Sequence, residues 1–153
     1  MGEKVPNQIV GIELPEQLDL RYSAYIAQRL QDERVIWLTT VSSDAMPQPR
    51  PVRFLWQNGA FSVFSAPTAY KLKHIARNPQ VALHFDGGAT GEDVAVFLSE
   101  AYVQTYPFPQ NVVDSYLSKY ADDLTQRGFS IEKYIKPDYV LLKIIPIKFR
   151  GSV

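Results

Sequence analysis

The residues best suited to bind an anion lie in one long stretch of the chain that has no acidic residue. Positions 45–85 contain no Asp or Glu, yet they contain five Lys or Arg residues and both histidines of the protein. The whole chain has 16 basic and 16 acidic residues, so the rest of it is net acidic. Clustered positive charge attracts anionic ligands. The zero net charge therefore conceals a positive region suited to a phosphate.

Two arginines of this stretch lie in a segment that alternates like a strand. From Pro49 on, a period of two places Arg50 on the face of Val52 and Arg53 on the opposite face with Pro51. An arginine on an otherwise apolar stripe needs a partner, because burying an unpaired charge is costly. A phosphate would serve, since guanidinium binds it through two parallel hydrogen bonds. A salt bridge to a distant carboxylate is the alternative.

A second group of candidate ligands follows where a strand runs directly into a helix. The strand ends at Ser65, and the first turns of the predicted helix carry Thr68 and Lys71. Unpaired N–H groups and the positive end of the helix dipole favour an anion there. Lys73 and Arg77 lie on another face of the helix and are interpreted as surface charge. Together the arginines and this helix start predict a phosphate-binding site.

The chain lacks the residues that several other kinds of site require. The chain has no Cys, which excludes disulfides and thiolate sites, and it has no glycine-rich dinucleotide loop, phosphate loop or nucleophile elbow. Neither His has a second ligand at metal-binding spacing, so no metal site is predicted. We expect His74 on a helix surface and His84 in a strand among apolar neighbours. Nucleic-acid binding is a further interpretation of the basic stretch, which we do not favour.

The elements that would position these residues are mostly strands. Helical spacing of apolar residues or β-rich composition predicts each of them. Helices are expected at 18–30, 67–77, 111–124 and 131–135, and strands at 34–41, 52–57, 60–65, 81–85, 93–106 and 139–149. Asn58-Gly59 predicts a hairpin turn, and Pro146 predicts a bulge or an edge position. The order favours a mainly β fold with flanking helices, in which six largely antiparallel strands curl into a barrel.

Length and composition agree with one soluble domain covering residues 1–153. The 46% share of apolar residues and the 21% share of charged residues are ordinary for a globular protein. The longest uninterrupted apolar run, 94–98, is far shorter than the roughly 20 residues of a membrane span. The first residues contain no apolar signal core. We therefore expect a cytoplasmic protein without a membrane segment.

Three segments together resemble a known family. Residues 47–56, the phenylalanine-rich strand 61–65 and residues 70–85 are similar to the pyridoxamine 5′-phosphate oxidase-like flavin-binding proteins. The similarity is greatest to their short branch of split-barrel flavin and deazaflavin reductases. The sequence Lys-x-x-x-Ile-x-x-Asn-Pro-x-Val at 71–81 is its most distinctive part. The resemblance covers 35–103 closely and the last strand loosely.

The resemblance implies a six-stranded antiparallel split β-barrel of the FMN-binding type, and a homodimer with the cofactor between its subunits. It implies a flavin-dependent oxidoreductase that uses FMN, or alternatively a deazaflavin coenzyme. A non-catalytic flavin or haem binder, or a stress-related protein, is the other alternative. The implied cofactor ligands are Arg50 and Lys71 on the phosphate, Pro51, Val52 and Arg53 along the isoalloxazine ring, and Phe64, Ser65 and Tyr70. No side chain is predicted to act as acid or base, in keeping with chemistry carried by the cofactor.

The sequence also departs from the authentic oxidase. Tyr70 stands where the oxidase has an arginine beside the helix lysine, and a ring-contacting glutamine corresponds to a position near Asp93. The substrate-binding segment at the end of the oxidase, with its Arg and His, has no counterpart. Oxidation of pyridoxamine phosphate is therefore not expected, and the sequence identifies no substrate.

Overall fold

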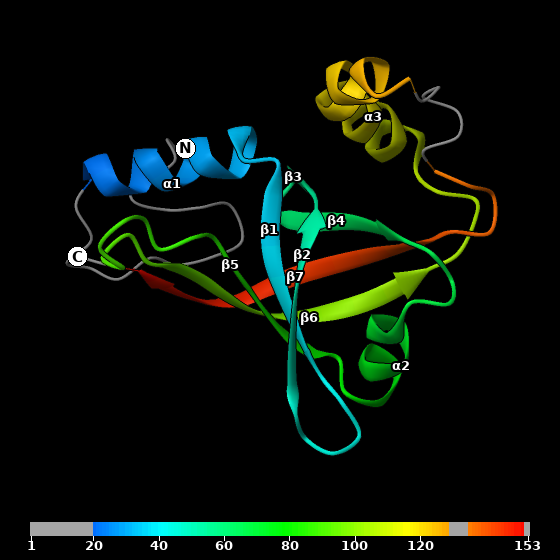
Figure 1. Cartoon of the computed structure of the whole chain (residues 1–153), viewed down its shortest axis with the longest axis horizontal. Coiled ribbons are helices and arrows are strands. Elements are labelled where there is room, and N and C mark those ends of the chain that lie inside the picture. The colour runs from blue at the N-terminus through cyan, green and yellow to red at the C-terminus, as the bar shows by residue number, and fades with distance from the viewer. Residues whose placement is uncertain (1–19, 129–134, 152–153) are drawn as a thin grey trace, which may run out of the picture.

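The computed structural model of the protein describes residues 20–128 and 135–151 (Figure 1). Three helices and seven strands follow one another along the chain. They are α1 (Leu20–Asp32), β1 (Val35–Val41), β2 (Pro47–Arg53), β3 (Leu55–Gln57), β4 (Ala60–Ser65), α2 (Tyr70–Arg77), β5 (Gln80–His84), β6 (Ala95–Gln104), α3 (Gln110–Gln126) and β7 (Val140–Gly151). In Figure 1, α1 and α3 lie above the sheet and α2 lies below it. The fold is mainly β with flanking helices, as predicted.

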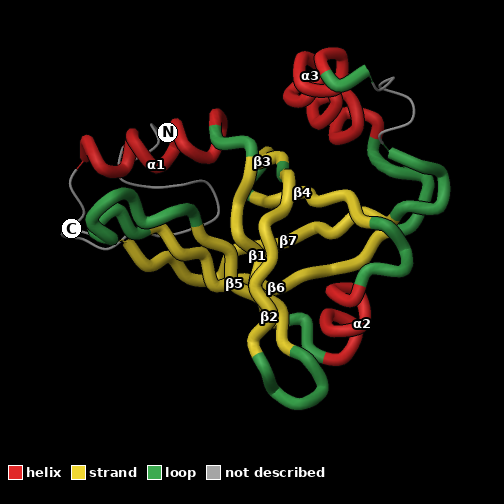
Figure 2. Tube along the Cα trace, in the orientation of Figure 1, coloured by secondary structure: helices red, strands yellow, loops and turns green. Residues whose placement is uncertain are grey.

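The seven strands form one antiparallel sheet in the order β2-β1-β5-β6-β7-β4-β3. Its two edge strands, β2 and β3, are consecutive in the chain and only Phe54 separates them. The chain therefore leaves one edge of the sheet and enters the other within a single residue. This forces the sheet to curl, as Figure 2 shows, and gives the split-barrel architecture.

The break at Phe54 divides the strand predicted at 52–57, so the sheet has seven strands rather than six. Side chains of α3 bind the backbone groups that no neighbouring strand reaches. The Phe54 N–H donates to the Tyr120 hydroxyl at 2.8 Å, and Lys119 Nζ donates to the Phe54 carbonyl at 3.0 Å. The Tyr120 hydroxyl also lies 2.8 Å from the Phe54 carbonyl and 2.7 Å from that of Arg34, so these two acceptors share its proton. Hydrogen bonds from a distant helix thus hold the closure point.

The core fills the inside of the curled sheet. Alternate residues of each strand point inward, which gives β1 and β6 their alternating burial. Five phenylalanines pack ring against ring at centroid separations of 4.7–6.4 Å with Trp56 among them. They are Phe54, Phe61, Phe85, Phe97 and Phe149, and all are buried. From α1, Ile26 and Leu30 complete this cluster.

Most predicted elements are present with shifted ends. The second helix begins at Tyr70 rather than at 67, and its N-cap, Ala69, makes no side-chain hydrogen bond. The irregularity predicted at Pro146 is confirmed, because the register shifts between Leu98 and Ser99, opposite Lys148 and Pro146. Positions 131–134 of the helix predicted at 131–135 lie outside the described residues. No helix within the described part of the chain is long and apolar enough to cross a membrane.

The lysine at the closure point makes a pH-dependent contribution to stability. Lys119 Nζ lies 3.7 Å from the centroid of the Phe54 ring, and burial, followed by the charge of Arg34, lowers its pKa from 10.5 to about 8. The folded chain therefore releases this proton more readily than the unfolded chain. The resulting stabilisation is complete above about pH 10.5 and is lost as the pH falls through about 8.

We therefore expect wild type to gain stability relative to Lys119→Met as the pH rises from 8 to 10.5. Urea unfolding of both proteins across this range measures the difference. Groups that titrate in both proteins cancel in the comparison. A difference that stays constant with pH would contradict this account of Lys119.

Candidate phosphate and cofactor site

The pairing of β1 with β2 fixes the direction of the arginines. Directly paired residues of antiparallel strands point to the same face, and Leu38 pairs with Arg50 while Ile36 pairs with Val52. Leu38 and Ile36 are buried on the inner face of β1, so Arg50 and Val52 lie on that face of β2. Arg53 pairs with the exposed Val35 and lies on the opposite face. Arg50 and Arg53 therefore lie on opposite faces of β2, as the sequence predicts.

The second candidate group comes from α2. This helix follows β4 after a short turn and contacts β1. On α2, the side chain of Ile75 is buried, whereas those of Lys73 and Arg77 are exposed. This agrees with the interpretation of Lys73 and Arg77 as surface charge. Lys71 and His74 are half-buried and lie three residues apart, which places them on neighbouring positions of one helix face. That face points toward the β1–β2 hairpin.

Two cavities adjoin at Lys71. The first, of about 440 Å³, is lined by residues of β2, β4, α2, α3 and the segment before β7. The second, of about 480 Å³, lies between α2 and the β1–β2 hairpin. Ala69 and Lys71 line both. Of the eight predicted cofactor ligands, Val52, Arg53, Phe64, Ser65 and Lys71 line the first cavity, and Arg50, Pro51, Tyr70 and Lys71 line the second.

The charges at this junction have one sign. Burial lowers the pKa of Lys71, and the neighbouring Arg50 guanidinium lowers it further. Among the described residues, none of those lining either cavity is acidic. The structure therefore holds two cations close together without a carboxylate between them. An anion bound there would relieve both the repulsion and the cost of desolvation.

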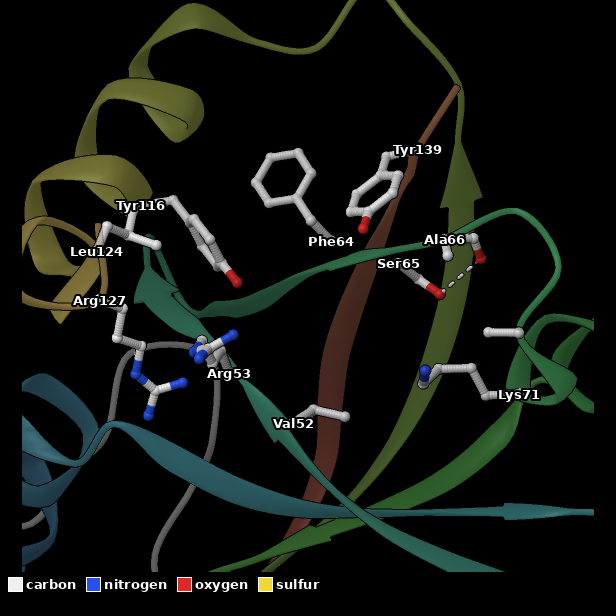
Figure 3. A pocket seen from close by; sticks show the side chains of 11 residues that line it. Val52, Arg53, Phe64, Ser65, Ala66, Lys71, Tyr116, Leu124, Arg127 and Tyr139 are labelled. Carbon is white, nitrogen blue, oxygen red and sulfur yellow. Dashed lines mark hydrogen bonds between the residues drawn. The ribbon is translucent and has the colours of Figure 1, made fainter. Parts of the chain in front are cut away.

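The first cavity has an aromatic wall, of which the sequence predicted only Phe64 (Figure 3). The ring of Phe64 packs edge-on against Tyr116 of α3 at a centroid distance of 4.8 Å, and Tyr139 lies on the same side. Figure 3 shows Arg53 and Arg127 on one flank of the cavity, with Ser65 and Lys71 on the other. The Ser65 hydroxyl donates to the Ala66 carbonyl at 3.0 Å. The cavity thus combines a flat apolar wall with polar flanks.

His74 was predicted on the helix surface, but the structure gives it a buried partner. Its Nδ1 lies 2.7 Å from the hydroxyl of Thr40, which is only 2% exposed, and the ring lines the second cavity. Asp93 lies elsewhere: it accepts hydrogen bonds from Tyr25 at 2.7 Å and from Arg29 at 3.1 Å, and it lines neither cavity. The structure thus adds His74 to the candidate site, whereas Asp93 bonds to α1.

A sequence comparison identifies the family. The profile of the family described as pyridoxamine 5′-phosphate oxidase matches residues 23–151. The chain belongs to the pyridoxamine 5′-phosphate oxidase family. No curated protein sequence matches the chain. Among the residues that the structure describes, no group of three or more His, Asp or Glu is placed to hold a metal ion.

Solved structures of differently named proteins share this fold. A conserved hypothetical protein of Mycobacterium tuberculosis, Rv2991, is 18% identical with a TM-score of 0.68, over 95% of this chain and 88% of that chain. An F420 reductase is 17% identical with a TM-score of 0.60, over 80% and 94%. The haem storage protein HutZ of Vibrio cholerae is 14% identical with a TM-score of 0.66, over 84% and 92%. At identities this low, the similarity shows only that these proteins share the fold of the pyridoxamine 5′-phosphate oxidase family.

Proposed function

We propose that this protein is an FMN-dependent oxidoreductase that holds the cofactor phosphate between Arg50 and Lys71. One observation carries the proposal. The two cations are close enough for Arg50 to lower the pKa of Lys71, at the junction of two cavities whose described lining has no acidic residue. A guanidinium and an ammonium together neutralise a phosphate and supply it with several donors.

The first cavity would then receive the isoalloxazine ring. Its volume of about 440 Å³ is within the usual range of small-molecule sites. Val52 and Arg53 on β2 and Ser65 on β4 would lie along the ring, and the rings of Phe64 and Tyr116 would cover apolar surface. Pro51 and Tyr70 line the second cavity and would contact the ribityl phosphate end. FMN would supply the electron transfer, and these residues would bind it, orient it and exclude water.

A homodimer is the second part of the proposal. The outward face of the sheet carries a row of exposed apolar and aromatic residues, a feature typical of interaction surfaces. Trp37 is 39% exposed and stacks on His84, with 6.4 Å between centroids and 6° between planes. Leu98 and Ile147 continue this row on β6 and β7 and are also exposed. We assign the face to a second copy of the chain, in keeping with a family that is usually dimeric.

The dimer is testable by mass. We expect light scattering at micromolar concentration to give about twice the 17.4 kDa of one chain. Trp37→Lys places an unpaired charge in the proposed interface and should shift the mass toward that of one chain. The exposed Tyr106→Lys, away from the Trp37 row, is the matched control. A wild-type mass of one chain would contradict the shared site.

The oxidoreductase function is tested by turnover. The protein reconstituted with FMN is mixed with NADH or NADPH and a quinone under anaerobic conditions, and the flavin absorbance and nicotinamide oxidation are followed. The proposal predicts repeated reduction and reoxidation of bound flavin. Tight FMN binding without electron transfer to any acceptor would leave a non-catalytic binder instead.

The names of similar structures suggest two other ligands, so the ligand-binding experiment includes two further titrations. One similar structure is described as an F420 reductase and another as a haem storage protein. A deazaflavin coenzyme and haem are therefore titrated beside FMN. Binding of the deazaflavin alone would replace FMN in the proposal, and binding of haem alone would overturn the oxidoreductase.

A further inference from the structure

The second cavity contains a third basic side chain that the proposed function does not use. His74 lines it together with Arg50 and Lys71. The Thr40 hydroxyl, 2.7 Å from Nδ1, holds the ring, and Thr40 itself is buried on the inner face of β1. Because Nδ1 is engaged by this hydroxyl, Nε2 is the ring nitrogen left for a ligand in the cavity. With the hydroxyl as the donor to Nδ1, Nε2 carries a proton and would donate it to a phosphate oxygen.

The position of His74 on α2 agrees with a role toward the cavity. It lies one turn after Lys71 on the same half-buried face. The other basic side chains of the helix, Lys73 and Arg77, are exposed and line neither cavity. The basic side chains in the cavity therefore come from two elements, with Arg50 on β2 and both Lys71 and His74 on α2.

We propose that His74 is a specificity-determining residue that, with Arg50 and Lys71, selects the terminal phosphate of FMN over the substituted phosphate of FAD. The inference rests on the proposed function, since it assumes that the cofactor phosphate occupies this cavity. It goes beyond that function because it distinguishes FMN from flavin cofactors whose chain continues past the phosphate.

The chemistry of the two phosphate forms gives the reason. A phosphomonoester has three non-bridging oxygens and a charge of about −1.5 to −2 at neutral pH. In FAD the corresponding phosphorus is part of a pyrophosphate, so it has only two non-bridging oxygens and a single charge. Arg50, Lys71 and His74 supply one donor group for each oxygen of the monoester, and the described lining offers no carboxylate to compete. The substituted phosphate of FAD leaves one of the three groups without an acceptor on that phosphorus.

The test uses three variants and three ligands. His74→Phe keeps a flat ring without nitrogens, His74→Gln restores an N–H donor near the position of Nε2, and Thr40→Val removes the hydroxyl that orients the ring. FMN, FAD and riboflavin are titrated by flavin fluorescence, and circular dichroism checks folding. Riboflavin lacks the phosphate and reports the ring site alone.

We expect His74→Phe to weaken FMN binding about tenfold or more, FAD binding less, and riboflavin binding not at all. His74→Gln should recover most of the loss, and Thr40→Val should show part of it. An unchanged preference for FMN over FAD in His74→Phe would overturn the inference, as would an equal loss for all three ligands. If wild type binds FMN no better than riboflavin, the proposed phosphate site itself fails, which is a distinct result.

Discussion

Replacing both Arg50 and Lys71 by alanine will weaken FMN binding at least about a hundredfold and leave the fold intact. Each side chain would make charge-assisted hydrogen bonds to the phosphate, worth roughly 1.5–3 kcal/mol apiece, and every 1.4 kcal/mol is a factor of ten in the dissociation constant. The fold survives because Arg50 is exposed and Lys71 only half-buried. Titration calorimetry with FMN and with riboflavin measures the effect, and only the affinity for FMN should fall.

The helix α2 offers a matched control for this double variant. Lys73→Ala combined with Arg77→Ala removes the same two charges from exposed positions that line neither cavity. We expect it to change FMN affinity only through long-range charge, by a factor that decreases as salt is added. If the control loses as much affinity as the Arg50 and Lys71 variant, a diffuse positive surface rather than a built phosphate site would explain the binding.

Tyr120→Phe will lower the free energy of unfolding by about 2–3 kcal/mol, because the buried Phe54 N–H loses its hydrogen-bond acceptor and carbonyls at the closure point lose a donor. The ring itself stays, so packing of the α3 cluster is kept. Chemical denaturation followed by circular dichroism, without added flavin, measures the change. We also expect weaker FMN binding, since Phe54 directly follows the strand that carries Arg50.

Tyr102→Phe is the control for the tyrosine hydroxyl. Tyr102 is exposed, and its hydroxyl donates to Glu100 at 2.8 Å on the surface of β6. Its loss should change the free energy of unfolding by no more than about 0.5 kcal/mol. Equal effects of the two variants would mean that the Tyr120 hydroxyl does not hold the closure between β2 and β3.

Local patterns predicted the elements of the candidate phosphate site. The alternation around Arg50 and the helix that carries Lys71 depend on neighbours in sequence, and both are present. The helix begins at Tyr70, however, so Thr68 lies in the turn before it and lines neither cavity. The strand break at Phe54 could not be predicted in the same way, because Val52 to Trp56 is uniformly rich in β-forming residues. It depends on a hydroxyl 66 positions further along the chain. Tertiary contacts here override local propensity.

The remaining wall of the site depends on the same long-range closure. Tyr116 and Arg127 reach the first cavity because α3 packs against β3 at the end of the sheet. Nothing in the helix itself indicates which face would meet β4. His74 was predicted on the surface because a lone histidine at helical spacing gives no sign of Thr40, a buried hydroxyl 34 positions earlier. Contacts between distant strands and helices were therefore the part that sequence patterns could not supply.

The central claim is that a phosphate-bearing flavin binds at the junction of the two cavities through Arg50 and Lys71. It is tested most directly by the affinity of purified wild type for FMN relative to riboflavin, which differ only in the phosphate. We predict one FMN per chain, with twin absorbance bands in the near ultraviolet and blue, and an affinity at least about a hundredfold above that for riboflavin. Equal affinities for the two, or no binding of FMN, would contradict the account.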